Sequence, residues 1–328
     1  MVKCDRSCGE TKHNMVNSAT KTVREWVSDE EIVGHSVFSY SEVCSALPHY
    51  SKQVISIELS RLVRSGIITL VHRGFYVTIP TRYKKTGIVP PHYYIDALQR
   101  HLGKPYYMSL LSAAAMHGAA HQRPQVDFVS TTLPRTSTSK DLNPHIRWVY
   151  RSPVPDEFIC VRNDDSGVIR YSSPELTAPE LVQYEHLVGG LGAVATVLSE
   201  LVECIDFSKE QISRIFSVVK DRTVQRTGYL LDEVLGESKQ ADALHEAARK
   251  QMPRMKWTLL SSRSNERERG ESARWKIKVN AEVEPARSSV VYAGHAGEGK
   301  EIQPRAEAAL YLGGRTAAVQ DKGGDKLQ

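Results

Sequence analysis

The sequence predicts an α+β protein, in which a small N-terminal domain precedes a larger mixed α/β domain. Residues 39–80 show a helical apolar period that changes abruptly into two short β-rich runs. The paired prolines Pro90 and Pro91 follow as a stiff connector. Beyond residue 92, short alternating runs precede long helical stretches, and the 328 residues are enough for two hydrophobic cores.

The N-terminal domain is expected to begin with two helices. Residues 18–33 form the first, and their apolar period predicts an inward face of Val23, Trp26, Val27 and Val33. Ser41 is expected to cap a short second helix over Glu42–Leu47, because Pro48 disfavours helical geometry in the residue before it.

The next helix is expected to run from Lys52 to Ser65, with Ser51 as its N-terminal cap and Gly66 in a left-handed C-terminal cap. Its apolar stripe consists of Ile55, Leu59, Leu62 and Val63. The opposite face carries short hydrogen-bonding or cationic side chains, namely Gln53, Ser56, Ser60, Arg61 and Arg64. A helix with such a face suits the major groove of DNA.

Two β-rich runs, IITLV and FYVTI, flank His72, Arg73 and Gly74 and predict a hairpin with a cation at its tip. Helix, turn, helix and hairpin is the order of a winged helix-turn-helix domain, which predicts binding to duplex DNA. The expected DNA-binding residues are Ser51, Lys52, Gln53, Ser56, Ser60, Arg61, Arg64, His72 and Arg73. A structural three-helix domain and a protein-binding winged helix remain as alternatives.

The composition is that of an ordinary soluble protein with a net charge of +5, which favours nucleic acid or an acidic partner only weakly. No apolar run reaches the ~20 residues that span a bilayer, and the first residues lack the apolar core of a signal peptide. The five cysteines, Cys4, Cys8, Cys44, Cys160 and Cys204, are odd in number and scattered. We therefore expect reduced thiols in a cytoplasmic protein.

Two arrangements of metal-ligating residues deserve comparison with known sites. Cys4, Cys8 and His13 offer three ligands without an obvious fourth. His117 and His121 are four residues apart, but no glutamate lies between them and Gly118 interrupts the helix. We therefore expect no metal and no other cofactor.

The expected domain boundaries place a flexible tail at 1–17, the winged helix at 18–80, a linker at 81–91, an α/β domain at 92–286 and a disordered tail at 287–328. Expected helices of the second domain cover Tyr93–Leu102, Tyr106–His117, Pro174–Val188, Leu191–Ile205 and Ser208–Leu235, the last with a break near residues 221–226. Expected strands cover Gln125–Ser130, His145–Tyr150, Phe158–Val161 and Gly167–Ser172. Ser173 before Pro174, and Ser208 before Gln211, predict helix starts.

The second domain offers no complete active site. Asp127 on an expected strand, with Asp164 and Asp165 later, leaves a DNA-targeted nuclease as one possibility, but the usual Glu-x-Lys is absent. The chain has no phosphate loop, no Gly-x-Ser-x-Gly elbow and no Cys–His pair. We therefore expect a non-enzymatic protein.

Two stretches are basic. Residues 82–104 carry five Lys or Arg against one Asp, and residues 249–278 carry ten against three Glu. Each stretch is either a phosphate-contacting surface or an ordinary solvated one.

Long motifs of the chain resemble one family. They are GFYVTIP, PPHYYIDAL, YYMSLLSAAAMHGAAHQRPQ, VDFVST, SSPELTAPELVQYEHLVGGLGAVATVLSELVE, RTGYLLDEVLG and WKIKVNAEVEP, and they extend from about Val23 to Pro285. These motifs resemble the AbiEi-type antitoxins of abortive-infection, or phage-defence, toxin–antitoxin systems. The resemblance implies autorepression at inverted-repeat operators by two or more copies, and a C-terminal domain that counteracts a nucleotidyltransferase toxin. It leaves open whether toxin and antitoxin touch, because these systems are described as type IV.

The sequence therefore predicts an antitoxin and transcriptional autorepressor whose partners are operator DNA and a nucleotidyltransferase toxin, with no membrane. In this interpretation Gln53, Ser56, Ser60 and Arg64 read base edges. Lys52, Arg61 and Arg73 then contact phosphates. The alternative is a stand-alone winged-helix regulator whose second domain senses a ligand or partner.

Overall fold

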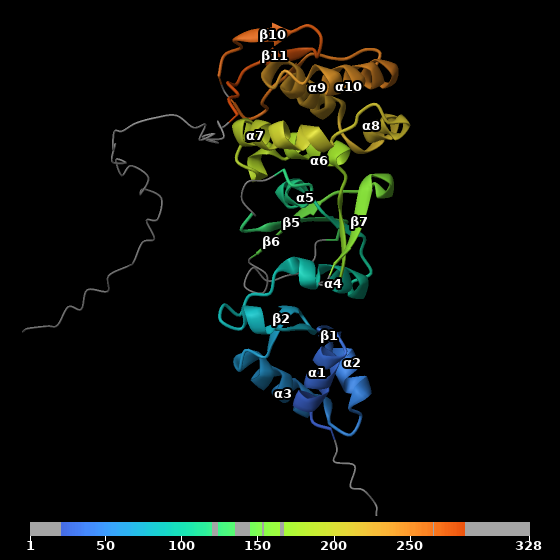
Figure 1. Cartoon of the computed structure of the whole chain (residues 1–328), viewed down its shortest axis with the longest axis vertical. Helices are drawn as coiled ribbons and strands as arrows, with labels where there is room; N and C mark the ends of the chain where they lie inside the picture. Colours follow the sequence, from blue (N-terminus) through green and yellow to red (C-terminus); the bar gives the residue numbers. More distant parts are fainter. Residues whose placement is uncertain are drawn as a thin grey trace, which may run out of the picture. The chain divides into compact units, whose positions relative to one another are not determined.

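The computed structural model describes residues 21–119, 124–134, 145–152, 154–164, 167–264 and 266–285. The expected terminal tails, and the expected ligands Cys4, Cys8, His13 and His121, lie outside these residues, as does Asp165. We divide the described chain into an N-terminal unit, residues 21–80, and a C-terminal part, residues 81–285. The N-terminal unit contains α1 (Val23–Ile32), β1 (Val37–Ser39), α2 (Tyr40–Ala46), α3 (Lys52–Arg64), β2 (Ile68–His72) and β3 (Phe75–Thr78) (Figure 1).

Helix α2 begins at Tyr40, two residues before its expected start. The Ser39 hydroxyl accepts a hydrogen bond from the Glu42 amide at 3.2 Å, and the Glu42 carboxylate accepts one from the Ser39 amide at 2.5 Å. This reciprocal pair is a capping box. The prediction that Ser41 caps the helix is therefore wrong, because Ser39 stands three residues before the glutamate that completes the box. The same arrangement, made by Thr22 and Glu25, begins α1.

Helix α3 confirms its prediction almost to the residue. The Ser51 hydroxyl accepts from the Val54 amide at 3.3 Å, and Gly66 after the helix has a φ of +66°. The stripe of Ile55, Leu59 and Leu62 is buried. These side chains meet α1, α2 and the start of β2 in a core formed by Val23, Trp26, Val27, Phe38, Val43, Leu47, Ile55, Leu59, Leu62 and Ile68. Val33, expected to face inward, is 65% exposed because α1 ends before it.

The hairpin is present, and a third strand that the sequence did not reveal joins it. Strands β2 and β3 pair antiparallel, and β1 pairs with the other edge of β3, with Val37 opposite Val77. Gly74 has a φ of +73° in the turn, and its carbonyl accepts from the Tyr40 amide at 2.8 Å. The hairpin is therefore tied to the start of α2.

The hairpin also packs against the C-terminal part. Its Val71, Phe75 and Val77 share one hydrophobic cluster with Ile95 and Leu98 of α4 (Ile95–His101). Figure 1 shows α4 beside the small sheet. The intervening segment forms two short 3-10 turns, η1 (Thr81–Tyr83) and η2 (Pro91–Tyr93), and buries Val89 and Pro91. Val89 and Pro91 are therefore packed at the end of this segment, whereas residues 84–88 are exposed.

A mixed five-stranded sheet forms the middle of the C-terminal part, in the order β6-β5-β4-β8-β7. Its strands are β4 (Tyr106–Met108), β5 (Asp127–Thr131), β6 (Ile146–Tyr150), β7 (Ile159–Asp164) and β8 (Gly167–Ser172). The four outer strands match their predicted positions within a few residues. Residues 106–117, predicted as one helix, are instead the central strand β4 followed by α5 (Leu110–Met116). All three residues of β4 are buried, so this strand lacks the alternation that would have identified it.

Helices follow the sheet. They are α6 (Pro174–Gln183), α7 (Leu191–Leu201), α8 (Ile215–Val218), α9 (Asp221–Tyr229) and α10 (Ser238–Gln251), with 3-10 turns η3 (Asp156–Phe158), η4 (Glu185–Leu187), η5 (Val202–Cys204) and η6 (Glu210–Arg214), and a π-helical turn at Leu230–Val234. Pro174 stands at the start of α6 as expected, but the Ser173 hydroxyl makes no cap hydrogen bond. The capping box expected at Ser208 is also wrong: its hydroxyl donates to Asp206 at 2.6 Å.

The last described segment was not predicted, and it docks through one tryptophan. Helix α10 precedes a second small sheet, β10-β11-β9, made of β9 (Thr258–Leu259), β10 (Gly270–Ser272) and β11 (Ile277–Val279). Trp275 before β11 is fully buried, and its indole N–H donates to Asp232 at 2.8 Å. Gly228 of α9 makes room for the ring, since a Cβ there would lie 2.1 Å from it.

In the part of the chain that the structure describes, no helix combines the length and the apolarity that crossing a bilayer requires.

Candidate nucleic-acid interface

Helix α3 presents a continuous polar face opposite its buried stripe. The exposed residues on it are Lys52, Gln53, Ser56, Ser60, Arg61 and Arg64. Two apolar side chains interrupt this face, Val54 at 39% and Ile57 at 46% exposure. Branched aliphatic groups of this kind can contact the thymine methyl group, so they are compatible with a groove. The sequence did not single them out, although both lie between the predicted polar positions.

Several polar groups of α3 already have intramolecular partners. The Ser60 hydroxyl donates to the Ser56 carbonyl at 2.8 Å, and Arg61 forms an ion pair with Glu58 at 2.5 Å. An exposed pair of this kind contributes at most ~1 kcal/mol, so Arg61 can exchange Glu58 for a phosphate at low cost. Among the described residues, the side chains of Gln53, Ser56 and Arg64 form no hydrogen bond within the protein.

The two hairpin residues of the predicted set differ in their surroundings. Arg73 is exposed at the turn. His72 is half-buried, its Nδ1 has no hydrogen-bond partner among the described residues, and His101 and Lys104 of the α4 region are its charged neighbours. Burial lowers the pKa of His72, and those two groups lower it further. His72 is therefore turned toward α4, whereas Arg73 faces solvent.

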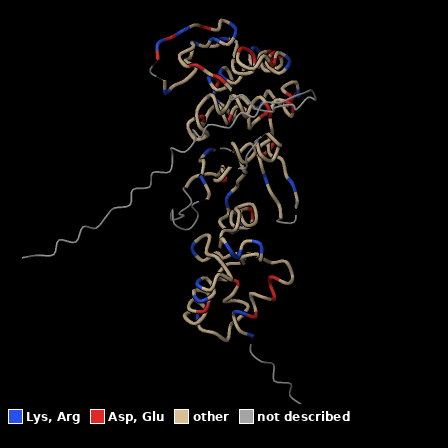
Figure 2. Tube along the Cα trace, turned by 60° about the vertical axis from the view of Figure 1, so that its left-hand side comes forward, with Lys and Arg blue, Asp and Glu red and all other residues tan. Residues whose placement is uncertain are grey.

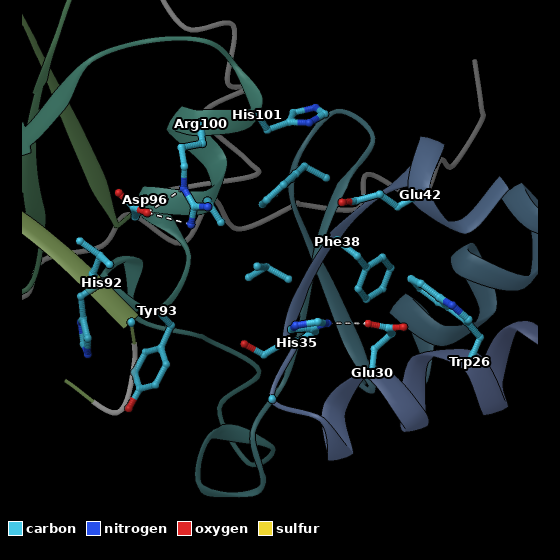
Figure 3. A pocket seen from close by; sticks show the side chains of 17 residues that line it. Trp26, Glu30, His35, Phe38, Glu42, His92, Tyr93, Asp96, Arg100 and His101 are labelled. Carbon is cyan, nitrogen blue, oxygen red and sulfur yellow. Dashed lines mark hydrogen bonds and ion pairs between the residues drawn. The ribbon is translucent and has the colours of Figure 1, made fainter. Parts of the chain in front are cut away.

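A cavity of about 640 Å³ lies where the N-terminal unit meets α4 (Figure 3). Glu30 of α1 accepts a hydrogen bond from His35 Nδ1 at 2.9 Å, and Asp96 of α4 pairs with Arg100 at 2.9 Å. Trp26, Phe38 and Tyr93 add aromatic surface. The cavity is thus mixed in character, with its main acidic groups already paired or, for Glu42, engaged in the α2 cap.

His117 and Asp127, which the sequence analysis weighed as a metal ligand and a nuclease carboxylate, have structural partners. His117 Nε2 lies 2.8 Å from the Ser172 carbonyl, and burial lowers the pKa of the ring. The Asp127 carboxylate accepts from the Ser112 hydroxyl at 3.2 Å, and that hydroxyl accepts from the Phe128 amide. In the described ranges, no group of three or more His, Cys, Asp or Glu side chains is arranged to hold a metal ion.

The sheet separates Asp127 from Asp164. Strands β4 and β8 lie between β5 and β7, so the two strands are about 14 Å apart at three spacings of ~4.8 Å. Strands β5 and β7 run in the same direction, and Asp127 begins one while Asp164 ends the other. Asp127 and Asp164 therefore cannot share one metal ion and do not form the carboxylate pair of a nuclease.

The structure contains a buried charged cluster that the sequence did not predict. Arg151, after β6, donates to Glu180 of α6, to the Tyr107 hydroxyl at 3.0 Å and to the Val218 carbonyl at 2.6 Å. Tyr107 also donates to Glu180 at 2.5 Å. Burial raises the pKa of Glu180, although the nearby guanidinium opposes this shift. The cluster joins sheet and helices, and its only sequence signal is a glutamate inside the apolar run of α6.

Ion pairs neutralise part of the basic stretch at residues 249–278. Arg274 pairs with Asp232 and Asp242, Arg269 with Glu266 and Glu282, and Lys278 with Glu268, at distances of 2.5–3.1 Å. Figure 2 shows Lys and Arg mixed with Asp and Glu in this part of the trace. Much of the excess of cations in the sequence is therefore offset by acidic side chains that lie close in space.

Comparison with known proteins defines the class of the C-terminal part. Residues 107–233 match a family model described as the AbiEi antitoxin C-terminal domain. The chain therefore contains an antitoxin domain, which supports an antitoxin role in a toxin–antitoxin system. The resemblance of the chain's motifs to the AbiEi-type antitoxins is confirmed for these residues.

Two further comparisons bear on the fold. The crystal structure of the RV2827C protein from Mycobacterium tuberculosis is similar with a TM-score of 0.58 and 15% sequence identity, over 77% of this chain and 89% of that chain. At this identity the likeness establishes a shared fold and nothing about activity. A search of curated proteins found no match.

Proposed function

We propose that this antitoxin is also the transcriptional autorepressor of its operon, and that the N-terminal unit is a winged helix that binds operator DNA. The observation that carries the proposal is the two-sided character of α3, which buries Ile55, Leu59 and Leu62 and exposes its polar face. A helix held rigidly by its core, with free hydrogen-bonding groups outward, is suited to reading base edges.

Each exposed group has a role in this proposal. Gln53, Ser56, Ser60 and Arg64 read base edges, and Ser51 lies at the end of the helix where phosphates pass. Lys52, Arg61 and Arg73 contact phosphates. His72 lies near the hairpin tip but is assigned no direct DNA contact, because His101 and Lys104 of the α4 region are its neighbours. Two or more copies would bind an inverted-repeat operator in the cytoplasm.

A DNA-binding titration with the promoter region of its own operon tests the proposal. The Arg64→Ala/Arg73→Ala variant should weaken specific binding by about 2–4 kcal/mol, since a good base contact contributes ~1–3 kcal/mol. It should also reduce the salt dependence by about one unit of slope for the phosphate contact of Arg73. Arg24→Ala, at an exposed cation of α1, is the matched control and should bind as the wild type. Unchanged binding by the double variant would refute the groove assignment.

The antitoxin activity is proposed to act on a nucleotidyltransferase toxin and to require no catalysis by this chain. Co-expression with the neighbouring toxin gene, scored as growth, tests this role. The full chain carrying Arg64→Ala/Arg73→Ala should still rescue growth when both genes are driven by unrelated promoters. The full chain is preferable to residues 90–286, because removing the hairpin would expose Ile95 and Leu98, which it covers.

A stand-alone regulator remains the second candidate. The cavity of about 640 Å³ beside the small sheet favours it, because a ligand bound there would contact both α1 and α4. The absence of growth inhibition by any neighbouring gene would favour this candidate over the antitoxin proposal.

A further inference from the structure

A second, smaller cavity lies on the C-terminal part, at the beginning of α9. It has a volume of about 280 Å³ and is lined by the end of α6, by the first turns of α9 and by Ser262. We call it the α9 cavity. Its cationic residues are Lys220, Arg222 and Arg226. Among the described residues that line it, none is acidic.

Arg226 is the most informative of these residues, because it is only 8% exposed. Its Nε donates to the Leu259 carbonyl at 2.9 Å, and its two terminal NH₂ groups form no hydrogen bond with the described residues. No carboxylate of the described chain lies within ion-pair distance of it. A buried guanidinium without an ion-pair partner is costly, so this position favours an anionic ligand.

The neighbouring charges support the same conclusion. Burial lowers the pKa of Arg226, the Glu185 carboxylate opposes this shift, and the adjacent Arg222 adds a smaller lowering. Glu185 does not line the cavity, and burial raises the pKa of its own carboxyl. Asp221 is exposed beside Arg222 and does not line the cavity either. An anion in the cavity would therefore give Lys220, Arg222 and Arg226 a countercharge that the described lining does not supply.

The remaining walls indicate more than a bare anion. A volume of about 280 Å³ is many times the ~10–15 Å³ that holds a single water, so the cavity has room for a group larger than one phosphate. Tyr184 adds a half-buried aromatic side chain, and Gln183 and Ser262 add hydrogen-bonding groups. Aromatic rings stack on nucleobases, and guanidinium groups bind phosphate oxygens in pairs.

We propose that the α9 cavity binds the phosphate group of a nucleotide, with Lys220, Arg222 and Arg226 on the phosphate and Tyr184 beside the nucleoside. This site lies within or next to the matched antitoxin domain and is independent of the DNA contacts proposed for α3. The proposed ligand is a nucleotide, and nucleotides are also the substrates of the nucleotidyltransferase toxin in the proposed function.

Calorimetric titration of the full chain tests the proposal. The probes are inorganic phosphate, adenosine, and adenosine, guanosine, cytidine and uridine 5′-phosphates at about 0.15 M salt. At least one nucleotide should bind, and adenosine should not. Lys220→Ala and Arg222→Ala should each weaken nucleotide binding about tenfold or more, because a hydrogen bond to a charged group contributes ~1.5–3 kcal/mol. Arg226→Lys keeps the charge but loses the paired contact, and it should weaken binding similarly.

The controls separate this site from the DNA-binding role. Arg214→Ala removes an exposed cation of η6 that does not line the cavity, and it should bind nucleotides as the wild type. Arg222→Ala should keep its affinity for operator DNA, which also shows that it folds. If inorganic phosphate binds as tightly as every nucleotide, the nucleotide assignment is overturned. If no phosphate compound binds, the proposal fails. It also fails if Arg222→Ala instead weakens binding to the purified toxin, because the cavity then takes a protein carboxylate.

Discussion

Replacing Gly228 with alanine should destabilise the protein, although alanine has a higher helix propensity than glycine. At an unconstrained helical position this change would stabilise by ~0.8–1 kcal/mol. Here the new Cβ would lie 2.1 Å from the Trp275 ring, so the ring must move by more than 1 Å to reach ordinary contact. The ring is fully buried and hydrogen-bonded to Asp232. Overpacking should lower the free energy of unfolding by about 3 kcal/mol, and the better helix propensity of alanine should raise it by about 1 kcal/mol. The net effect is a loss of about 2 kcal/mol.

Urea unfolding followed by far-ultraviolet circular dichroism measures this loss. The same Gly228→Ala change in a Trp275→Leu background is the matched comparison, because leucine lacks the three ring atoms that the Cβ would meet. In that background the effect should reverse sign and stabilise by about 1 kcal/mol relative to Gly228. Equal or greater stability of Gly228→Ala with Trp275 present would refute the packing described for α9 and the second small sheet.

Three further predictions concern stability. Arg151→Met should cost about 3–5 kcal/mol in urea unfolding, because it leaves Glu180 buried and charged without its partner, and adding Glu180→Leu should recover most of that loss. Ser39→Ala should lower the free energy of unfolding by about 1 kcal/mol through loss of the α2 cap. Acidification from pH 7.5 to 5.5 should destabilise the protein. Burial lowers the pKa of His117 in the folded protein, whereas in the unfolded chain this histidine has its ordinary pKa near 6.5. The unfolded chain therefore binds more protons as the pH falls, and the free energy of unfolding decreases.

Each of these has its own control. Ser41→Ala removes a hydroxyl that bonds the Ser39 hydroxyl at 2.8 Å but no backbone amide of α2, so it should lower stability less than Ser39→Ala; equal losses at both serines would contradict the capping box. A double variant as unstable as Arg151→Met alone would show that apolar side chains do not fit the cluster. For the pH effect, His117→Gln should flatten the decline on acidification, and a slope identical to that of the wild type would exclude His117 as its source.

The elements that the sequence predicted well are those with local signals. Helix α3 has a capping serine, an apolar period and a glycine after its last turn, all within residues 51–66, and the hairpin has its turn glycine at residue 74. The exposed polar face of α3 followed from the same period. By contrast, the orientation of His72 depends on α4, about thirty residues later, and no local pattern encodes it.

The elements that the sequence missed depend on distant partners. Strand β4 is a strand because it pairs with residues 129–131 on one side and with Tyr171 on the other, while its own three residues have no alternation. The second small sheet is held by Trp275 over Gly228, forty-seven residues earlier. Arg151 and Glu180 meet from a strand end and a helix interior, so their pairing could not be read from spacing.

The hydrophobic cluster shared by the hairpin and α4 has a consequence for exchanging parts between related proteins. A graft that replaces residues 21–80 must supply side chains that fit Ile95, Leu98 and Tyr94, because otherwise apolar surface of the C-terminal part would be exposed. A compatible donor hairpin must therefore match Val71, Phe75 and Val77 in volume. Substituting the exposed residues of α3 leaves this cluster intact, whereas replacing the whole N-terminal unit rebuilds one side of it.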